Sequence, residues 1–390
     1  MPTQKQRTQH LQWALELTSI PTAAGREHRV IKWIERWLNR RPELMLKRDR
    51  VGNLLLRTKS RRRIDPVIFT AHLDHPAFVV REVLGDRELR LEFRGGINAA
   101  YFKNGRVLIY DAGDRAHPAR IVAHEKGTNF DEVLVRLVRP SDSIALDDVA
   151  TWDIKPATVR KGRLHAPACD DLAGVAAALS ALDILRRRKN AGPVGVLLTR
   201  AEEVGFVGAI EACEAGFIPS NAKVIALENS RSFPESPIGG GPIVRVGDRI
   251  SVFHHGLLYA VSQIADQVAK KDKSFVWQRK LMPGGACEAT TFQAYGCEAI
   301  CLCLPLGNYH NMGEIDRVLN GVSDAPAKAA AEFVSVADYH GLVRLLIECG
   351  LKLGDRETEF ADGARAILDR MREIRRKRGF VLDEKAARIR

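Results

Sequence analysis

Four short apolar runs along the chain have the length and composition of buried β-strands. Between them lie stretches with helical periodicity, at residues 170–192 and 205–216. In the first stretch one helical face carries Leu172, Val175, Leu179, Leu182 and Leu185. Strands that alternate with helices predict an α/β fold with a sheet flanked by helices. The four runs are "PVIFTAHLD" at 66–74, "VGVLLTRAEE" at 194–203, "KVIALENS" at 223–230 and "EAICLCLPLG" at 298–307.

The N-terminal region predicts two amphipathic helices, separated by a break between Ile20 and Gly25. In the second helix, apolar residues recur at helical spacing and form one stripe, which consists of Val30, Trp33, Ile34 and Trp37. Such a stripe is typical of a face that packs on the core. We therefore expect its tryptophans to be structural.

Residues 78–162 have a different pattern, in which short β-branched alternations such as "RVLIYDAG" are separated by Gly, Asp and Pro. This pattern is typical of a small all-β module. We therefore predict a main domain in two parts, 1–77 and 163–353, interrupted by an inserted β-rich domain at 78–162. A basic tail, 354–390, follows, and its stretch "ARAILDRMREIRRKRGF" predicts one amphipathic helix.

The composition is that of an ordinary globular protein, with 45% hydrophobic and 28% charged residues in a chain of 390. The net charge of +12 comes from scattered basic clusters. Aromatic residues make up 6% and are not interleaved with these clusters, as single-stranded nucleic-acid binding would require. We therefore expect solvated surface at these clusters and no nucleic-acid partner.

The seven cysteines show no CxxC spacing, and Cys301 and Cys303 alternate along one strand face, where core packing is favoured. The N-terminus has no apolar signal core, and no apolar run approaches the length of a membrane span. These features predict a cytoplasmic protein with reduced cysteines and no membrane partner.

Each of the four apolar runs delivers a potential metal ligand at its carboxyl end or just after it. Open α/β sheets place their sites outside the carboxyl ends of the strands, so residues distant in sequence are expected to converge there. The candidates are His72 and Asp74, Glu202 and Glu203, Glu228, and His310, together with Asp170 and Asp171 at the start of the helical stretch.

Imidazole and carboxylate groups together suit zinc or cobalt, and an aspartate with two oxygens can bridge two ions. Two divalent ions bring four positive charges. Asp170, Glu203 and Glu228 would balance three of them, and a bridging hydroxide would balance the fourth. Glu202 is then left to take the proton of the bridging water as general base and pass it to a leaving amine.

Two further inferences concern histidines. Asp74 follows two residues after His72 and is expected to hydrogen-bond the second nitrogen of that imidazole. His254 and His255 precede a predicted helix and match no ligand spacing, so we interpret them as surface or capping residues.

Each candidate ligand also has an ordinary structural interpretation. His72 could be a hydrogen-bonded core histidine, and Asp170 a helix N-cap. The adjacent pair at 202 and 203 could place negative charge at a helix N-terminus. None of these interpretations explains why the candidates all fall at strand ends.

Five stretches in this order resemble the tetrahedral aminopeptidases, a family of dinuclear-metal exopeptidases that includes glutamyl and deblocking aminopeptidases. They are "TAHLDHPAF", "CDDLAG", "TRAEEVGFVGA", "GGGPIVRVGD" and "YHNMGE". The resemblance implies a zinc-exopeptidase-like fold, a mixed sheet flanked by helices. It also implies an inserted small β-barrel or PDZ-like domain that serves oligomerisation or substrate access.

The same resemblance divides the ligands between two divalent ions. One ion would be held by His72, Asp170 and Glu228, and the other by Asp170, Glu203 and His310. Glu202 would be the catalytic base, and the peptide bond between Asp170 and Asp171 would be cis.

The resemblance implies a metal-dependent aminopeptidase that hydrolyses N-terminal residues from peptides and forms a homo-oligomer, in the family often a dodecamer. Two alternatives stay open. The first is a related amidohydrolase, dipeptidase or deacylase with the same metal site, and the second is a non-catalytic peptide-binding relative.

Two positions depart from the family pattern. The family commonly has aspartate where this chain has Glu228, and it usually shows "GGTDA" where this chain has "GGACEAT" at 284–290. The second departure bears on substrate specificity and motivates the non-catalytic alternative.

Overall fold

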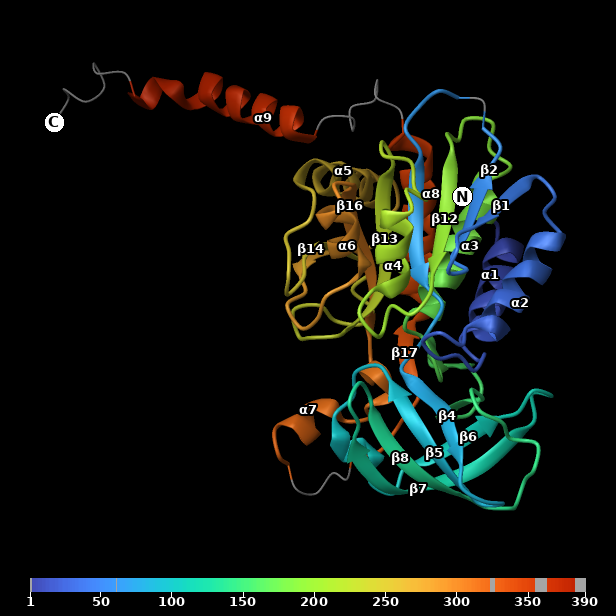
Figure 1. Cartoon of the computed structure of the whole chain (residues 1–390). Helices are drawn as coiled ribbons and strands as arrows, with labels where there is room; N and C mark the ends of the chain where they lie inside the picture. Colours follow the sequence, from blue (N-terminus) through green and yellow to red (C-terminus); the bar gives the residue numbers. More distant parts are fainter. Residues whose placement is uncertain (1, 61, 323–326, 355–362, 383–390) are drawn as a thin grey trace.

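The four predicted strands lie side by side in one sheet of the computed structural model, which describes residues 2–60, 62–322, 327–354 and 363–382 (Figure 1). Each strand is parallel to its neighbour among the four. The carboxyl ends of parallel strands meet at the same edge of the sheet, so residues at these ends are brought together. In sheet order the strands are β12 (Val194–Thr199), β3 (Val67–His72), β13 (Lys223–Arg231) and β16 (Glu298–Leu306).

Further strands extend this sheet on both sides, in the order β1-β2-β12-β3-β13-β16-β14-β15. β2 (Leu54–Thr58) is antiparallel to β12, and β14 (Ile243–Gly247) is antiparallel to β16. The outer positions are taken by β1 (Leu44–Arg48) and β15 (Gln278–Leu281). The sheet is therefore mixed, and the predicted fold class is confirmed.

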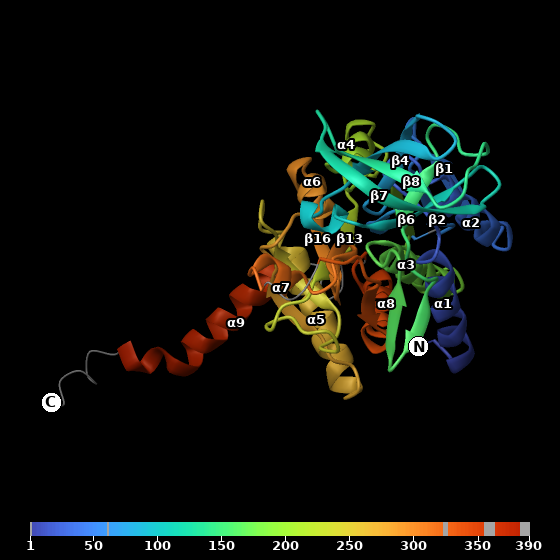
Figure 2. The same ribbon diagram turned by 90° about the horizontal axis from the view of Figure 1, so that it is seen from below.

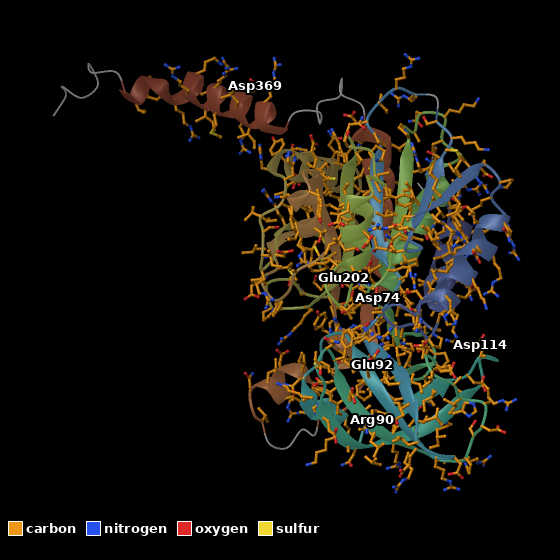
Figure 3. The ribbon with its side chains drawn as sticks, viewed as in Figure 1. Asp74, Arg90, Glu92, Asp114, Glu202 and Asp369 are labelled. Atoms are coloured by element: carbon orange, nitrogen blue, oxygen red, sulfur yellow. The ribbon has the colours of Figure 1, made fainter. Side chains whose placement is uncertain are left out.

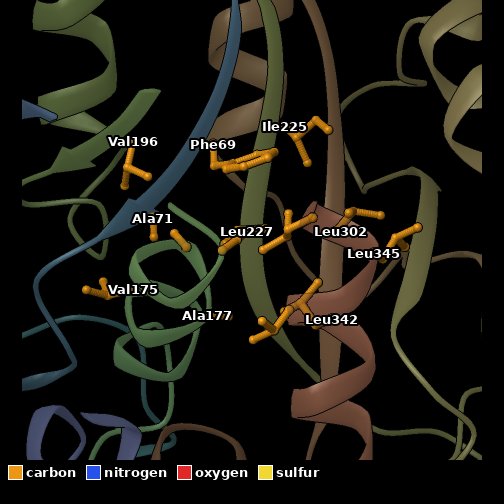
Figure 4. Close-up of a cluster of buried hydrophobic side chains, with 14 of the residues drawn as sticks. Phe69, Ala71, Val175, Ala177, Val196, Ile225, Leu227, Leu302, Leu342 and Leu345 are labelled. Atoms are coloured by element: carbon orange, nitrogen blue, oxygen red, sulfur yellow. The ribbon is translucent and has the colours of Figure 1, made fainter. Parts of the chain in front are cut away.

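Helices cover both faces of the sheet, because successive side chains of a buried strand point to opposite sides. Phe69 packs on one face in the same buried cluster as Leu342 (Figure 4), whereas Ile68 packs on the other face with Phe292. The first face carries α1 (Gln4–Leu17), α2 (His28–Asn39), α3 (Leu172–Leu185), α5 (His255–Lys271) and α8 (Val336–Lys352). The second carries α4 (Val207–Glu214) and α6 (Glu288–Ala294).

The predicted helices occur where the apolar spacing places them. In α2 the predicted stripe turns inward, with Val30, Ile34 and Trp37 buried. All residues of α3 are buried, since this helix packs on β3, β12 and β13 and also contacts α1 and α8. His254 caps α5 by accepting a hydrogen bond from the backbone N–H of Leu257 at 3.2 Å, which confirms its interpretation as a capping residue.

The inserted β-rich segment forms a closed barrel in the strand order β4-β5-β8-β7-β6-β9. Its interior is filled by aromatic side chains, among them Phe78, Phe93, Phe102 and Trp152. We keep 78–162 as the proposed limits of the inserted domain. The barrel consists of β4 (Ala77–Val83), β5 (Glu88–Arg94), β6 (Arg106–Tyr110), β7 (Ala116–Lys126), β8 (Asp131–Leu137) and β9 (Val149–Trp152), with the 3-10 helix η1 (Ala99–Phe102) after β5.

Three further strands form a small sheet in the order β10-β11-β17, and β17 lies between the barrel and the main sheet (Figure 1). It contains β10 (Thr158–Arg160), β11 (Arg163–Ala166) and β17 (Glu332–Ser335). The short helices η2 (Tyr309–Asn311) and α7 (Ile315–Leu319) lie between β16 and β17 in the chain.

The described part of the tail, residues 363–382, is helical, as the sequence predicts. It forms α9 (Gly363–Arg378), followed by η3 (Gly379–Leu382). α9 contacts α5 and from there extends away from the rest of the chain in both views (Figures 1 and 2). Residues 355–362 and 383–390 of the predicted tail lie outside the described residues. Among the described helices, none combines the length and the apolar character that crossing a bilayer demands.

Candidate metal centre

The predicted ligands meet at the carboxyl edge of the four central strands, on the side that faces the barrel. His72 is the last residue of β3, and Glu228 lies near the end of β13. Glu202 follows β12 and lies close to Asp74 at this edge (Figure 3). Ala201, with φ of 55°, turns the chain after β12 and carries the two glutamates into the site.

Asp170 lies at the centre of the cluster and faces a different histidine with each carboxylate oxygen. Its Oδ1 is 3.5 Å from His72 Nε2, and its Oδ2 is 3.5 Å from His310 Nε2. His310 Nε2 is also 3.5 Å from Glu203 Oε1. These separations are long for hydrogen bonds. They match the spacing of roughly 3.4 Å between two ligand atoms that each lie about 2.1 Å from a tetrahedral zinc ion.

Two overlapping sets of ligand atoms are compact enough to hold an ion, each with all its atoms within 4.8 Å of one another. The first is His72, Glu202 and Glu228, and the second is His72, Asp170 and Glu203. The structure thus brings together the six residues predicted as ligands or base. Because Glu202 belongs to the first set, the distances alone allow it to serve as a ligand or as the base.

Electrostatics favour cations at this site. Asp170 Oδ1 and Glu203 Oε1 are buried and have no hydrogen-bond partner among the described residues. Burial and neighbouring carboxylates raise the pKa of Glu202, Glu203 and Glu228 well above the ordinary value. Burial also opposes ionisation of Asp170, but its contacts with the two histidines leave its pKa below the usual value. Divalent cations would satisfy the unpartnered oxygens and favour the deprotonated carboxylates.

Asp74 positions the glutamate pair. Its Oδ1 accepts from the backbone N–H of Glu202 and its Oδ2 from that of Glu203, both at 3.0 Å. His72 Nδ1 lies 3.2 Å from the backbone oxygen of Asp74 and 3.5 Å from its carboxylate. The predicted hydrogen bond to His72 is therefore made by the backbone oxygen of Asp74, while its carboxylate holds the two glutamates.

Glu332 on β17 is a supporting residue that the sequence did not reveal. Its Oε2 accepts from the backbone N–H groups of Cys169 and Asp170 at 2.7 and 3.0 Å, and its Oε1 accepts from that of His310 at 2.8 Å. One fully buried carboxylate thus fixes two strand-end loops that carry ligands. Its contacts are all with backbone groups, which leave no signature in the sequence.

The barrel also contacts the loop that carries His310. The Nδ1 of His310 lies 2.6 Å from the carbonyl oxygen of Gly96, which follows β5, so Nδ1 carries the proton and Nε2 is free to bind metal. Tyr101 of η1 donates to the carbonyl of Gly313 at 2.6 Å. His310 has φ of 54°, a left-handed conformation that costs a non-glycine residue roughly 1–2 kcal/mol and needs such support.

Two further side chains hold the backbone around Asp170. His75 Nδ1 lies 2.5 Å from the Asp170 carbonyl oxygen, and burial is the main cause that lowers the pKa of His75 to about 4. Asn229 donates to the carbonyl of Cys169 and, at 3.3 Å, to Asp171 Oδ1. The peptide bond between Asp170 and Asp171 is cis, which confirms that expectation.

A cavity of about 130 Å³ opens beside the metal cluster and is lined by Glu228 and Tyr309 at the end nearest the ligands. Gly284, Gly285 and Ala286, the first residues of the divergent "GGACEAT" stretch, line it as well. Further along this stretch, Glu288 is buried and accepts from Thr70 Oγ1 at 3.1 Å. The departure from the family pattern therefore lies in the wall of this cavity.

Arg245 of β14 also lines the cavity and is 2% exposed. It donates to Ser230 Oγ at 3.1 Å and to the backbone oxygens of Met282 and Gly285, while its Nε has no partner among the described residues. Sequence reasoning did not identify Arg245, although its pattern could have done so. The strand reads "IVRVG", in which one cation lies between apolar residues.

Comparison with known proteins bears on the family and the fold of the chain. The M42 glutamyl aminopeptidase family matches residues 52–320. A curated protein of Bacillus subtilis (strain 168), YhfE, whose name assigns it provisionally to the aminopeptidases, is 23% identical over 214 residues. That match covers 50% of this chain and 62% of YhfE, so it spans less than two thirds of the curated relative.

Solved structures with the same fold include two archaeal peptidases. The TET1 peptidase of Pyrococcus horikoshii superposes with a TM-score of 0.71 at 20% identity, covering 89% of this chain and 100% of that one. Aminopeptidase APDkam598 of Desulfurococcus kamchatkensis gives 0.70 at 21% identity, covering 88% and 94%. These likenesses confirm the fold, and the family match extends over more than half of the chain. The chain therefore belongs to the M42 glutamyl aminopeptidase family, as its resemblance to the tetrahedral aminopeptidases predicts.

Proposed function

We propose that this chain is a metal-dependent aminopeptidase that removes N-terminal residues from peptides, using two divalent ions, zinc or cobalt. The observation that carries the proposal is the geometry of Asp170, whose two oxygens face His72 and His310 at equal distances of 3.5 Å. A carboxylate placed in this way fits a bridge between two ions. Family membership supports the peptidase reaction.

In this proposal the ligand sets are those that the resemblance to the tetrahedral aminopeptidases implies. His72, Asp170 and Glu228 hold one ion, and Asp170, Glu203 and His310 hold the other. When bound, the two ions would polarise the scissile carbonyl and lower the pKa of the attacking water.

Glu202 then moves the proton. Its carboxylate takes a proton from the attacking water and delivers it to the nitrogen of the leaving amine. The Asp74 carboxylate accepts hydrogen bonds from the backbone N–H groups of Glu202 and Glu203 and so fixes the backbone position of both residues. This supports one glutamate acting as the base and the other as a metal ligand. Glu202 is 7% exposed, so bulk water competes little for its proton.

The test is hydrolysis of a panel of aminoacyl p-nitroanilides by the full chain, stripped of metal and then reloaded with zinc or cobalt. Release that requires the metal and a free α-amino group would support the aminopeptidase. Faster cleavage of N-acylated amino acids or of dipeptides with a free carboxylate would instead favour the related deacylase or dipeptidase.

We further propose that the cavity beside Glu228 receives the N-terminal side chain of the substrate and favours an acidic one. Arg245 presents a buried guanidinium whose Nε is unpartnered, and no carboxylate forms a salt bridge with it among the described residues. Arg231 lines the same cavity, although it already pairs with Asp316. A substrate carboxylate in the cavity would give this guanidinium a direct ion-pair partner.

Arg245→Met is expected to lower kcat/KM for glutamyl p-nitroanilide by roughly 10- to 100-fold, the effect of losing a hydrogen bond to a charged group of about 1.5–3 kcal/mol. The leucyl substrate should change little. The exposed Arg249 provides the matched control, and Arg249→Met should leave both substrates unaffected. An equal loss on both substrates would show that Arg245 acts through packing and not through selectivity.

Assembly and location are also part of the proposal. The Pyrococcus horikoshii TET1 peptidase is described as assembling into a tetrahedron or a large octahedral shell. We propose a homo-oligomer for this chain as well, with a dodecamer as the expected form. All seven cysteines are free, which supports a reducing location such as the cytoplasm.

A further inference from the structure

We propose that the C-terminal helix α9, together with η3, binds the surface of an anionic lipid bilayer. This inference is independent of the proposed function. The segment lies beyond residues 52–320, the region that matches the family, and the metal centre draws none of its residues from it.

The apolar side chains of α9 form a stripe along one side of the helix. Ile367, Met371 and Ile374 are spaced four and three residues apart, which places them on one face, and Leu368 lies beside them. They are 39–49% exposed, although side chains of this kind gain free energy when removed from water. Beyond the helix, Phe380 and Val381 are 65% and 63% exposed and extend the apolar surface.

The remaining surface of α9 is strongly basic. Seven cations and two carboxylates give residues 363–382 a net charge of +5. The cations are Arg365, Arg370, Arg372, Arg375, Arg376, Lys377 and Arg378. Asp369 pairs with Arg372, and Glu373 pairs with Arg376 and Lys377, so the anions are neutralised within the helix.

The apolar stripe and the basic surface of α9 together favour one class of partner over the others. Nucleic acid would satisfy the cations but leave the aliphatic stripe in water. A second copy of α9 could cover the stripe, but it would bring another net charge of +5 against the first. An anionic bilayer satisfies both features, since the stripe enters the headgroup region while the cations remain at the phosphates. Such a helix lies in the interface and does not span the membrane, so it needs no long apolar run. The proposal therefore departs from the expectation of no membrane partner, which rests on the lack of such a run.

The test is co-sedimentation of the full chain with vesicles of phosphatidylcholine, with and without phosphatidylserine. Wild-type protein should bind the phosphatidylserine vesicles at least about tenfold more tightly, since each cation near the surface contributes to the attraction. High salt should weaken this binding. Equal binding to both vesicles, or no binding to either, would overturn the proposal.

Two variants of α9 separate the two contributions. Ile374→Asp breaks the stripe and should lower the affinity for phosphatidylserine vesicles at least about tenfold. Arg375→Gln combined with Arg376→Gln leaves the stripe intact and should lower it roughly thirtyfold. The matched control is Ile250→Asp, because Ile250 is 61% exposed and lies in the loop after β14, outside α9 and η3, and this variant should bind like wild type.

Hydrolysis of soluble aminoacyl amides should be the same in all these variants, which verifies that the chain is folded. An Ile374→Asp protein that binds vesicles like wild type would contradict the role of the stripe. Wild-type protein that ignores vesicles but binds transfer RNA would overturn the proposal and identify the basic face as a nucleic-acid surface.

Discussion

Glu202→Gln is expected to lower kcat by about 10²- to 10⁴-fold while leaving the bound metal unchanged. Glutamine has nearly the shape of glutamate, but its amide cannot take a proton from water. The backbone N–H of residue 202 keeps its bond to Asp74, so the loop should hold its position. The measurement is kcat on an aminoacyl p-nitroanilide, with metal content determined by mass spectrometry on the same sample.

The neighbouring glutamate provides the contrast. Glu203→Gln makes the same chemical change one residue away and should cause loss of metal, because Glu203 Oε1 faces His310 Nε2 at 3.5 Å. The exposed Glu235 controls for charge alone, and Glu235→Gln should behave as wild type. If Glu202→Gln loses metal instead, Glu202 is a ligand, as its compact grouping with His72 and Glu228 allows. Substantial remaining turnover would remove it from the proton transfer.

Asp170→Asn is expected to abolish binding of both ions, and with it all activity. A carboxamide has one oxygen in place of two, and its NH₂ group would face one of the cations. Zinc present at about 100 times its dissociation constant should stabilise the wild-type chain by about 2.7 kcal/mol, and this increment should vanish in the variant. Calorimetry with and without zinc, together with metal content, measures both effects.

A terminal ligand should behave differently from the bridging one. Glu228→Gln changes a residue that the proposal assigns to one ion, so this variant should keep close to one ion per chain. Retention of one ion by Asp170→Asn would show that Asp170 serves a single ion. Loss of both ions from Glu228→Gln would show that the two sites fill only together.

The four central strands of the main sheet could be predicted because their signal is local. Each of the four central strands is a buried apolar run, and burial of both faces removes the alternation that marks an exposed strand. Because these strands are parallel, the residues that follow each of them lie at the same edge of the sheet. His72 and Glu202 meet for this reason, although 130 residues separate them in the sequence.

The supports of the site could not be predicted in the same way. Glu332 lies on a strand of four residues and accepts only from backbone N–H groups, so no partner side chain identifies it. The contact between His310 and Gly96 joins two loops through a carbonyl, which every residue possesses. Arg245 could have been predicted from the sequence, since a cation inside an apolar strand indicates a buried charge that needs a partner.

The contact of His310 with Gly96 limits how this protein can be recombined. The barrel begins and ends on neighbouring antiparallel strands, β4 and β9, and therefore resembles a cassette that could be exchanged between relatives. Yet its Gly96 carbonyl orients one metal-facing imidazole, and Tyr101 holds the same loop at Gly313. A chimera that joins the ends correctly but alters these two loops would keep both folds and lose the orientation of His310. The inserted segment and the loop after β16 must therefore be exchanged together, even though more than 200 residues lie between Gly96 and His310.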